Sequence, residues 1–414
     1  MTIIKPKRSI KGGGGSTAGN TIKLTSQTIG AGVSTGDPVW FDGLNSQWLK
    51  STSSTNSPSG VYDGTNVILS GQATLSALLP GAVYFMAVAG GLTTTVTTTK
   101  IGIATSATLL MVDIDNEGTS TTYIGAGYFA GGETGAYVAT NDKLLYNSDT
   151  TATTTKGALT GIRGLFGGHN SSTYGYFSNG YNGSVPVATT DRLDFSVDST
   201  VMVTKGSSSQ ARYGPASANS TTNGYNTAGN SGAVVTTTDS LVYSSDTTTM
   251  VTKGASTQAR DRFPGCNSSS NGYFAGGQTS TPVATCDSIL FSSDTTSQVT
   301  KGALPQTRLD PGAANSSTNG YFAGASNPSA TTDGLNFSSD TTAQVTKGAL
   351  TQAKYGCYGN NSLTLGYFAG GYSTTYTNVN DGLLFSSDTT AQVTKGALTQ
   401  LKYLHSTCQS GGIR

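Results

Sequence analysis

The chain has 414 residues, enough for two or three domains, and its 23 lysines and arginines nearly balance its 22 aspartates and glutamates. A net charge near +1 leaves no basic surface for nucleic acid or for an anionic membrane. The longest apolar run, residues 82–89, is too short to cross a bilayer, so membrane insertion is not expected. The 55 glycines and the abundant threonine, serine and asparagine favour strands and turns, and no helical apolar period is found. We therefore expect an all-β protein.

Residues 1–20 are expected to form a flexible arm, because a segment such as GGGGSTAGN cannot bury enough apolar surface to order itself. Glycines follow its basic residues where a secretion signal would have an apolar segment, so no secretion signal is expected. The basic residues are candidates for docking the arm to a partner, with a solvated tail as the alternative. They are Lys5, Lys7, Arg8 and Lys11.

Residues 21–118 are predicted to be a small β barrel or sandwich, because short strand patterns alternate with turn signals. Residues 38–41 and 47–50 predict a hairpin, and residues 60–62 and 66–70 flank a second turn. Further strands are expected at 82–89, 100–104 and 108–113.

Three lines of this domain resemble a small β module of tail-fibre and other virion proteins of tailed bacteriophages. They are GDPVWFDGLNSQWLK, LLPGAVYFMAVAGGLTTT and KIGIATSATLLMVDID. The resemblance covers about 80 residues, and it implies a virion location; any small β barrel is the alternative. The matching residues are Gly36, Asp37, Val39, Trp40, Pro80, Gly81, Tyr84, Phe85, Ile101, Gly102, Ala104, Ser106, Ala107, Thr108, Leu109 and Leu110.

Residues 119–414 contain six repeats of about 48 residues, marked by a Gly-Tyr pair at Gly127, Gly175, Gly224, Gly272, Gly320 and Gly366. Each repeat predicts four short strands. In three repeats an Asn-Gly pair, as at Asn223-Gly224, predicts a tight turn between strands one and two. The third strand has an Asp-x-Leu-x-aromatic pattern, which puts the leucine and the aromatic residue on one buried face. Val-Thr-Lys segments form the fourth strand. A basic residue closes each repeat: Arg163, Arg212, Arg260, Arg308, Lys354 and Lys402.

Four strands per repeat at this period predict a six-bladed β-propeller. The order of motifs resembles the kelch repeat: a strand ending in Gly-Gly, a strand with an aromatic residue, then a basic residue. The resemblance is degenerate, because the repeats lack the tryptophan of kelch blades; Trp40 and Trp48 both precede them. The first repeat lacks a first strand, and an extra one follows Lys402. We therefore predict that the C-terminal segment, residues 403–408, closes the ring.

Charged residues recur in two places in each repeat, and we interpret both as structural. The aspartates of the Ser-Asp-Thr corners are expected to form Asx-type turns and not a metal site. They are Asp149, Asp198, Asp246, Asp294, Asp340 and Asp388. The third-strand aspartates and the basic residues that close the repeats are expected to pair within or between blades; basic side chains lining a pore are the alternative.

No catalytic constellation is visible, so we expect neither an enzyme nor a cofactor. His169 and His405 have no recognisable nucleophile nearby, and the four cysteines lack metal-ligand spacing. The cysteines are expected to be small buried hydrophobes without disulfides. They are Cys266, Cys286, Cys357 and Cys408.

The variable loops between the second and third strands carry the candidate ligand-binding residues Tyr137, Tyr181, Tyr372 and Tyr376. Loops on one rim of a rigid ring are a usual place for binding, and aromatic rings beside asparagine, serine and threonine suit sugars. The alternative is that these tyrosines pack on the next blade.

These features favour a non-enzymatic structural protein of a phage particle: tail fibre, baseplate, or capsid-attached fibre or decoration. Its partners would be other virion proteins and a host surface glycan or protein. It would be assembled in the host cytoplasm, and a homo-oligomer is left open. A non-viral bacterial carbohydrate- or protein-binding propeller is the alternative, and a hydrolase on a propeller scaffold ranks third.

Overall fold

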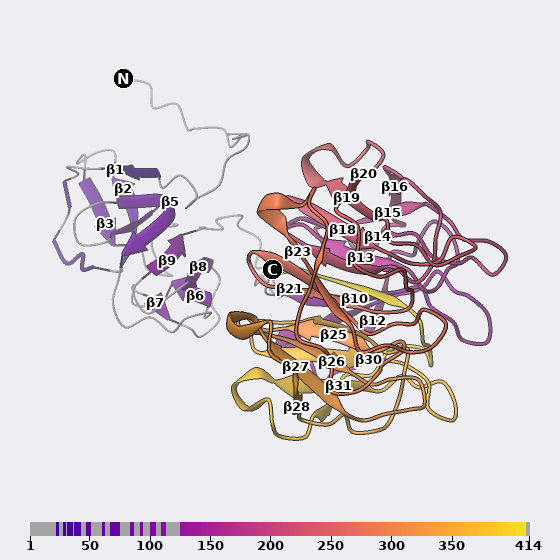
Figure 1. Ribbon diagram of the computed structural model, residues 1–414. Coiled ribbons are helices and arrows are strands. Elements are labelled where there is room, and N and C mark those ends of the chain that lie inside the picture. Colours follow the sequence, from indigo (N-terminus) through magenta and orange to yellow (C-terminus); the bar gives the residue numbers. More distant parts are fainter. Residues whose placement is uncertain are drawn as a thin grey trace. The chain divides into compact units, whose positions relative to one another are not determined.

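The computed structural model describes residues 125–410 without a break. Before them it describes only the strands of the first unit, residues 28–29, residues 31–35 and residue 37. The chain divides into two compact units, residues 1–123 and 124–414. All regular elements described are β-strands and short 3-10 turns, so the protein is all-β (Figure 1).

The first unit contains one connected nine-stranded sheet in the order β3-β2-β4-β5-β9-β8-β6-β7, with β1 beside β5. The predicted hairpin is confirmed by the antiparallel pairing of β2 with β3, and the second turn by the pairing of β4 with β5. The docking arm, with Lys5, Lys7, Arg8 and Lys11, lies outside the described residues. The strands are β1 (Ile22–Leu24), β2 (Pro38–Asp42), β3 (Gln47–Lys50), β4 (Gly60–Tyr62), β5 (Val67–Thr74), β6 (Val83–Met86), β7 (Leu92–Thr93), β8 (Lys100–Ala104) and β9 (Leu109–Val112).

The second unit consists of six four-stranded antiparallel sheets, a propeller-like arrangement. Sheet 1 has the order β33 (Ser406–Ser410), β10 (Ala126–Ala130), β11 (Asn141–Leu145), β12 (Thr154–Lys156). Sheet 2 is β13 (Gly167–Asn170), β14 (Tyr174–Ser178), β15 (Thr190–Asp194), β16 (Val203–Lys205). Sheet 3 is β17 (Ala216–Asn219), β18 (Asn223–Thr227), β19 (Thr238–Val242), β20 (Val251–Lys253).

Sheets 4 to 6 repeat the same strand order. Sheet 4 is β21 (Gly265–Asn267), β22 (Asn271–Ala275), β23 (Cys286–Leu290), β24 (Val299–Thr300). Sheet 5 is β25 (Gly312–Asn315), β26 (Asn319–Ala323), β27 (Thr332–Asn336), β28 (Val345–Lys347). Sheet 6 is β29 (Tyr358–Asn361), β30 (Leu365–Ala369), β31 (Asn380–Leu384), β32 (Val393–Lys395). The 3-10 turns are η1 (Tyr146–Ser148), η2 (Tyr243–Ser245), η3 (Phe291–Ser293), η4 (Phe337–Ser339) and η5 (Phe385–Ser387).

The C-terminal segment supplies the missing first strand of sheet 1, as predicted from the sequence. β33 pairs antiparallel with β10, from Ala126 opposite Ser410 to Ala130 opposite Ser406. In Figure 1 the yellow strand accordingly lies beside β10. This pairing satisfies backbone groups that would otherwise form an open sheet edge.

A second closure runs through the backbone just before each first strand. In every sheet, the residue two positions after the closing basic residue has a positive φ of 54° to 63°. Its N–H donates to the carbonyl of the equivalent residue in the preceding sheet, at 2.7 to 3.0 Å. The six hydrogen bonds form a closed cycle, because the last one, from Gly214, ends on the carbonyl of Leu165. The six positions, in the order of donation, are Leu165, Leu404, Gly356, Asp310, Arg262 and Gly214. The cycle passes through all six sheets.

The turns between first and second strands differ from the prediction in detail. The strands are adjacent and antiparallel, as expected. However, Asn223 and Gly224 lie inside β18, and the turn is formed by the residues before them, with the hydroxyl of Ser220 accepting the Asn223 N–H at 3.0 Å. Gly224 instead permits close packing between sheets, because a Cβ there would lie 2.0 Å from Nδ1 of His169.

The corner aspartates join neighbouring sheets, which corrects the prediction of Asx-type turns. Each carboxylate accepts a hydrogen bond from the hydroxyl of the second-strand tyrosine of the preceding sheet, at 2.8 to 3.0 Å. The lysine that ends the fourth strand of that preceding sheet, or in sheet 4 directly follows it, contacts the same carboxylate at 2.9 to 3.3 Å. We call this unit the clasp. The tyrosine–aspartate pairs are Tyr128–Asp198, Tyr176–Asp246, Tyr225–Asp294, Tyr273–Asp340, Tyr321–Asp388 and Tyr367–Asp149.

The third-strand pattern buries the leucine as predicted, whereas the aromatic residue lies just beyond the strand. Leu144 and Leu193 are 1% exposed. The aromatic residue stacks on the clasp tyrosine of the preceding sheet, with ring centroids 5.1 to 5.4 Å apart in all six pairs. Such stacking stabilises beyond the burial of apolar area, by about 0.5–1.5 kcal/mol per pair.

The basic residues that close the repeats pair within their own sheets and do not line a pore. Each side chain is at most 3% exposed and lies 2.6 to 3.1 Å from the third-strand aspartate. Lys402, near the end of the second unit, contacts Asp142, near its start. An ion pair therefore also joins the first and last parts of this unit. Burial lowers the pKa of Lys402 while Asp142 opposes this change.

Candidate functional site

The four predicted tyrosines lie on loops that follow the second strands, at the end of the sheets opposite the clasps. We call this end the loop face. It includes the residues next to the closing basic residues and the loops at 131–140, 179–189, 228–237, 276–285, 324–331 and 370–379. Gly131-Gly132 and Gly370-Gly371 have positive φ angles, which turn the chain out of the strand. All four tyrosines are half-buried.

The structure brings these tyrosines together in two groups and adds three more to them. Tyr137 packs edge-on against Tyr181, with ring centroids 5.9 Å apart, and Tyr181 packs against Tyr213 at 5.6 Å. In sheet 6, Tyr372 packs edge-on against Tyr376 at 5.5 Å. Tyr355 and Tyr403 join this second group. We call the seven residues the tyrosine arc.

The three added tyrosines share one position in the repeat, immediately after the closing basic residue, as in Arg212-Tyr213, Lys354-Tyr355 and Lys402-Tyr403. The sequence therefore contains a signal for them. Sequence reasoning misses it, because it assigns this position to a buried first strand. The arc crosses from one sheet to the next, so the alternative, that the tyrosines pack on the next blade, is also correct in part.

Glu133 joins the two groups of the arc. Its backbone pairs with both Tyr137 and Tyr403. Its carboxylate accepts hydrogen bonds from the hydroxyls of Tyr376 at 3.1 Å and Tyr403 at 3.2 Å. Burial and then this hydrogen bond raise the pKa of Tyr376, and burial with the charge of Glu133 raises the pKa of Tyr137. The arc therefore presents neutral phenols around one carboxylate.

The arc stops at sheets 4 and 5. The positions equivalent to Tyr213 and Tyr181 are Asp261 and Gln278 in sheet 4, where the two residues pair through their backbones. In sheet 5, the N–H of Ser326 bonds to the carbonyl of Leu309 at the corresponding place. The loop face therefore has an aromatic side, formed by sheets 6, 1, 2 and 3, and a side without tyrosine.

Arg262 and Asp310 carry the only side-chain charges in the backbone cycle. Nε of Arg262 lies 3.1 Å from Oδ1 of Asp310, and Nη2 contacts Oδ2. Burial raises the pKa of Asp310 to about 6, and the positive charge of Arg262 opposes that rise. Burial raises the pKa of the phenols of Tyr137, Tyr213 and Tyr355, which lie on three other sheets. The positive charge of Arg262 opposes this rise in all three.

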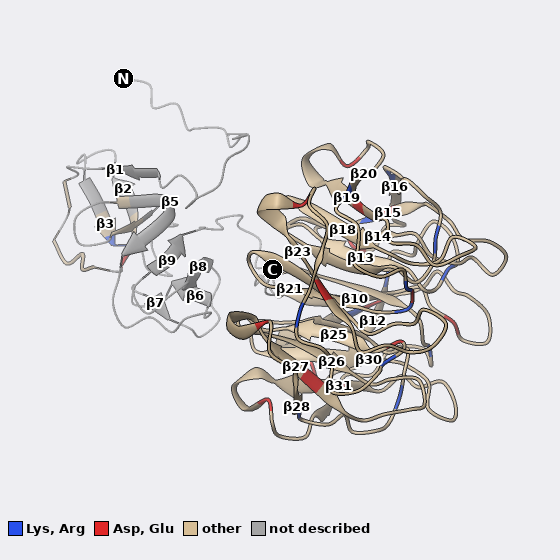
Figure 2. Cartoon of the chain, viewed as in Figure 1, with Lys and Arg blue, Asp and Glu red and all other residues tan. Residues whose placement is uncertain are grey.

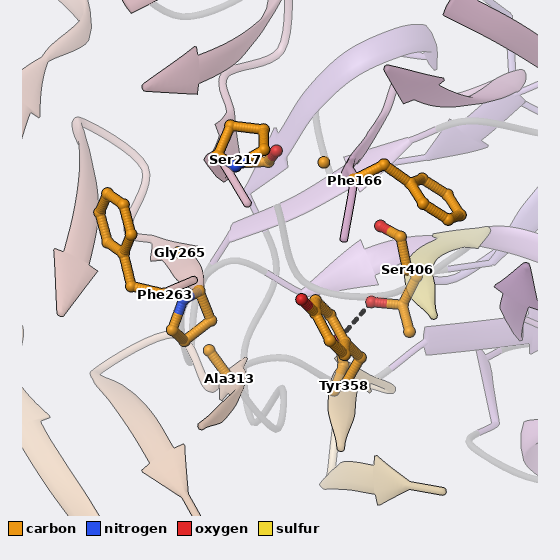
Figure 3. A pocket seen from close by; sticks show the side chains of 13 residues that line it. Phe166, Ser217, Phe263, Gly265, Ala313, Tyr358 and Ser406 are labelled. Carbon is orange, nitrogen blue, oxygen red and sulfur yellow. Dashed lines mark hydrogen bonds between the residues drawn. The ribbon is translucent and has the colours of Figure 1, made fainter. Parts of the chain in front are cut away.

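Beneath the cycle, a cavity of about 40 Å³ lies between the first strands (Figure 3). It is lined by residues that include Phe166, Phe263, Ser217, Tyr358 and Ser406. No charged side chain lines this cavity. A space of this size holds one or a few water molecules and no sugar ring. This space is therefore too small for a ligand as large as a sugar.

The histidines and cysteines are buried. His169 stacks on Tyr176 at 5.5 Å, and burial lowers its pKa to about 3. His405 is buried against Phe129 and Tyr358, and burial, followed by the charges of Lys402 and Lys354, lowers its pKa well below 6.5. All four cysteines are free and buried, which confirms that prediction.

Among the described residues, no group of three or more histidines, cysteines or acidic residues is placed to hold a metal ion. In the same part of the chain, no helix is long and apolar enough to cross a membrane.

Comparison with known proteins gives no family. No family of sequences matches the chain, and no curated protein matches it. A solved structure titled "Structure of YjhT" is similar, with a TM-score of 0.49 and 11% sequence identity. The similar region covers 59% of this chain and 87% of that chain.

Proposed function

We propose that the chain is a non-enzymatic structural protein of a phage particle. In this proposal the N-terminal arm and a first β domain, a barrel or sandwich, dock to the virion. Residues 124–414 form a six-bladed kelch-like propeller, closed by β33, that binds the host surface. The virion location rests on the resemblance of residues 36–110 to virion modules, and the binding role rests on the tyrosine arc.

The observation that carries the binding role is the contrast between a fixed ring and a variable face. Clasps, buried ion pairs and a backbone cycle repeat in every sheet, whereas the seven tyrosines occur on only four of the six. Repeated contacts are expected from stability alone. A contiguous aromatic surface on loops of one end is typical of recognition.

The non-enzymatic part of the proposal is supported by the surroundings of the histidines. His169 and His405 are packed among aromatic rings, with pKa values shifted away from proton transfer near neutral pH. Detection of hydrolysis of a host polysaccharide by the purified chain would overturn this part.

Two measurements test the two halves of the proposal. Electron cryomicroscopy and protein composition of purified phage particles should find the chain attached through its N-terminal residues; its absence from particles would remove the virion role. Labelled full-length protein should bind host cells, and a Tyr181→Ala/Tyr376→Ala variant should bind them more weakly. Binding that is unchanged in this variant would remove the role of the arc.

The second candidate is a non-viral bacterial propeller that binds carbohydrate or protein. The tyrosine arc favours it as much as it favours the first, because the arc is independent of the N-terminal module. Cell or glycan binding by a chain that is absent from particles would select this candidate.

A further inference from the structure

Every lysine and arginine between residues 125 and 410 contacts a carboxylate. These cations fall into three sets: the buried pairs within sheets, the clasps, and Arg262 with Asp310. Figure 2 shows the charged residues scattered singly through this unit, most of which is neutral. Within the described part of this unit, no cation remains without a carboxylate partner.

The carboxylates that lack a cation partner are Glu133, Asp194 and Asp261, again counted over residues 125–410. Asp194 lies at the other end of the sheet, where it accepts hydrogen bonds from Ser196. Glu133 and Asp261 lie on the loop face. Asp261 accepts a hydrogen bond from Asn230 at 3.3 Å, and burial raises its pKa.

The loop face is therefore weakly acidic as well as aromatic. Among residues 125–410, a ligand carboxylate or phosphate would find no free cation on this face, and taking Arg262 away from the buried Asp310 would leave a buried charge without a partner. Removing one partner of a buried ion pair is strongly destabilising. Uncompensated like charges across an interface, here a ligand anion beside Glu133, also disfavour binding.

We propose that the ligand of the tyrosine arc is an uncharged glycan, whose sugar rings stack on the tyrosines and whose hydroxyl groups bond to Glu133 and the neighbouring amides. This inference rests on the proposed function and names the chemical class that the binding head recognises. The charge pattern disfavours acidic glycans, such as uronic-acid, sialylated or phosphorylated chains.

A glycan fits this face better than a protein for a geometric reason. Protein partners usually anchor a large side chain in a desolvated pocket. The cavity at the axis is only about 40 Å³, and it lies below the backbone cycle. The tyrosine rings are half-buried, so part of each ring is exposed to contact the flat apolar face of a sugar. Polar groups such as Asn182, already bonded to the N–H groups of Ser184 and Val185, stand beside it.

The test titrates the full-length protein with oligosaccharides in matched pairs, each neutral chain beside the same backbone carrying a carboxylate or phosphate. Neutral chains should bind, with an affinity that hardly changes when ionic strength rises from about 0.05 to about 0.5 M. Tyr181→Ala and Tyr376→Ala should each weaken binding about three- to tenfold, from the loss of one stacked ring. Gln278→Ala, at the equivalent position of sheet 4, is the matched control and should change nothing.

A gain-of-function variant completes the design. Gln278→Lys adds a positive charge beside Asp261, which offsets the negative charge of this face and should raise binding of acidic chains at low salt. Tight, salt-sensitive binding of acidic chains by the unmodified protein would overturn the inference but leave the binding head in place. Binding of host cells that persists after their glycans are removed would overturn it equally, in favour of a protein receptor. Binding to neither glycans nor cells would overturn the proposed function itself.

Discussion

The two ends of the six sheets differ in how regularly their residues repeat from sheet to sheet. At the clasp end, all six sheets place a tyrosine, an aspartate and an aromatic ring in the same contacts with nearly the same distances. At the loop face, equivalent positions hold tyrosine, glutamate, asparagine, glutamine and serine. The comparison teaches that the repeat is maintained where neighbouring sheets must fit each other, and is free to vary where the sheets face a ligand.

The largest effect should come from opening the ring. Deletion of residues 403–414 removes β33, one member of the backbone cycle and the packing of Leu404 and Cys408 in sheet 1. We expect a loss of at least about 5 kcal/mol of unfolding free energy and a melting temperature lower by roughly 10 °C or more. Calorimetry of the full chain and of the deletion checks this. An unchanged melting curve would mean that closure contributes little.

The next effect concerns the close approach of sheets at the clasp end. A Cβ at Gly206 would lie 1.7 Å from the carbonyl oxygen of Thr248 in the next sheet, so Gly206→Ala forces the sheets apart. We expect a loss of roughly 3 kcal/mol, measured by urea unfolding. Gly161→Ala is the control, because a methyl group at that position would have no atom within 4 Å and the backbone there is ordinary. Equal effects of both substitutions would contradict the explanation.

We expect the stability of the fold to depend on pH through His405. Neither ring nitrogen of His405 has a hydrogen-bond partner among the described residues. Its pKa is low when folded, so the unfolded chain binds more protons and stability falls as pH falls below 6.5. Between pH 6.5 and pH 5 the cost from His405 alone is about 2 kcal/mol, and His169, whose pKa burial lowers to about 3, adds a similar cost.

Phenylalanine occupies the equivalent position in sheets 2 and 4, as Phe166 and Phe263. His405→Phe should therefore be at least as stable at neutral pH and should lose less stability in acid. Unfolding titrations at pH 7 and pH 5 measure both. A pH slope equal to that of the parent chain would show that His405 does not titrate on unfolding.

A smaller effect should come from a single clasp hydrogen bond. Tyr273→Phe keeps the stack on Phe337 but removes the hydroxyl that donates to Asp340 at 2.8 Å. We expect a loss of about 1–2 kcal/mol. Combining it with Asp340→Asn should cost less than the sum of the two single changes, because both remove the same contact. Tyr181→Phe on the loop face, as control, should cost little.

The fold was predictable because its signals recur. Six copies of one pattern fixed the strand count, the buried leucines and the need for a strand after Lys402. The partners of individual side chains were not predictable in the same way. The corner aspartates looked like local turns because their tyrosine and lysine partners lie on another sheet, about 70 residues away for Tyr128 and Asp198. Asn223-Gly224 was misplaced because close packing against His169, and not a turn, requires that glycine.

The candidate site shows the same limit. Four tyrosines were found because they lie in variable loops. Tyr213, Tyr355 and Tyr403 were missed, since only the three-dimensional arrangement shows that the start of a first strand reaches the same face. Glu133 occupies the repeat position of Tyr181 and Tyr372, yet its role follows only from the two hydroxyls that meet at its carboxylate.

The central claim, that one end of the sheets maintains the ring and the other binds, is tested most directly by two variants measured in two assays. Asp246→Asn weakens a clasp made by Tyr176, Arg192 and Lys205, and Tyr376→Ala removes one ring of the arc. Unfolding free energy and host-cell binding are measured on the same preparations. Asp246→Asn should lower stability by about 2 kcal/mol and leave binding unchanged, whereas Tyr376→Ala should weaken binding and should also lower stability by about 1–3 kcal/mol, because it removes two ring contacts and one hydrogen bond. The reverse pattern, or a loss of both properties in both variants, would contradict the account.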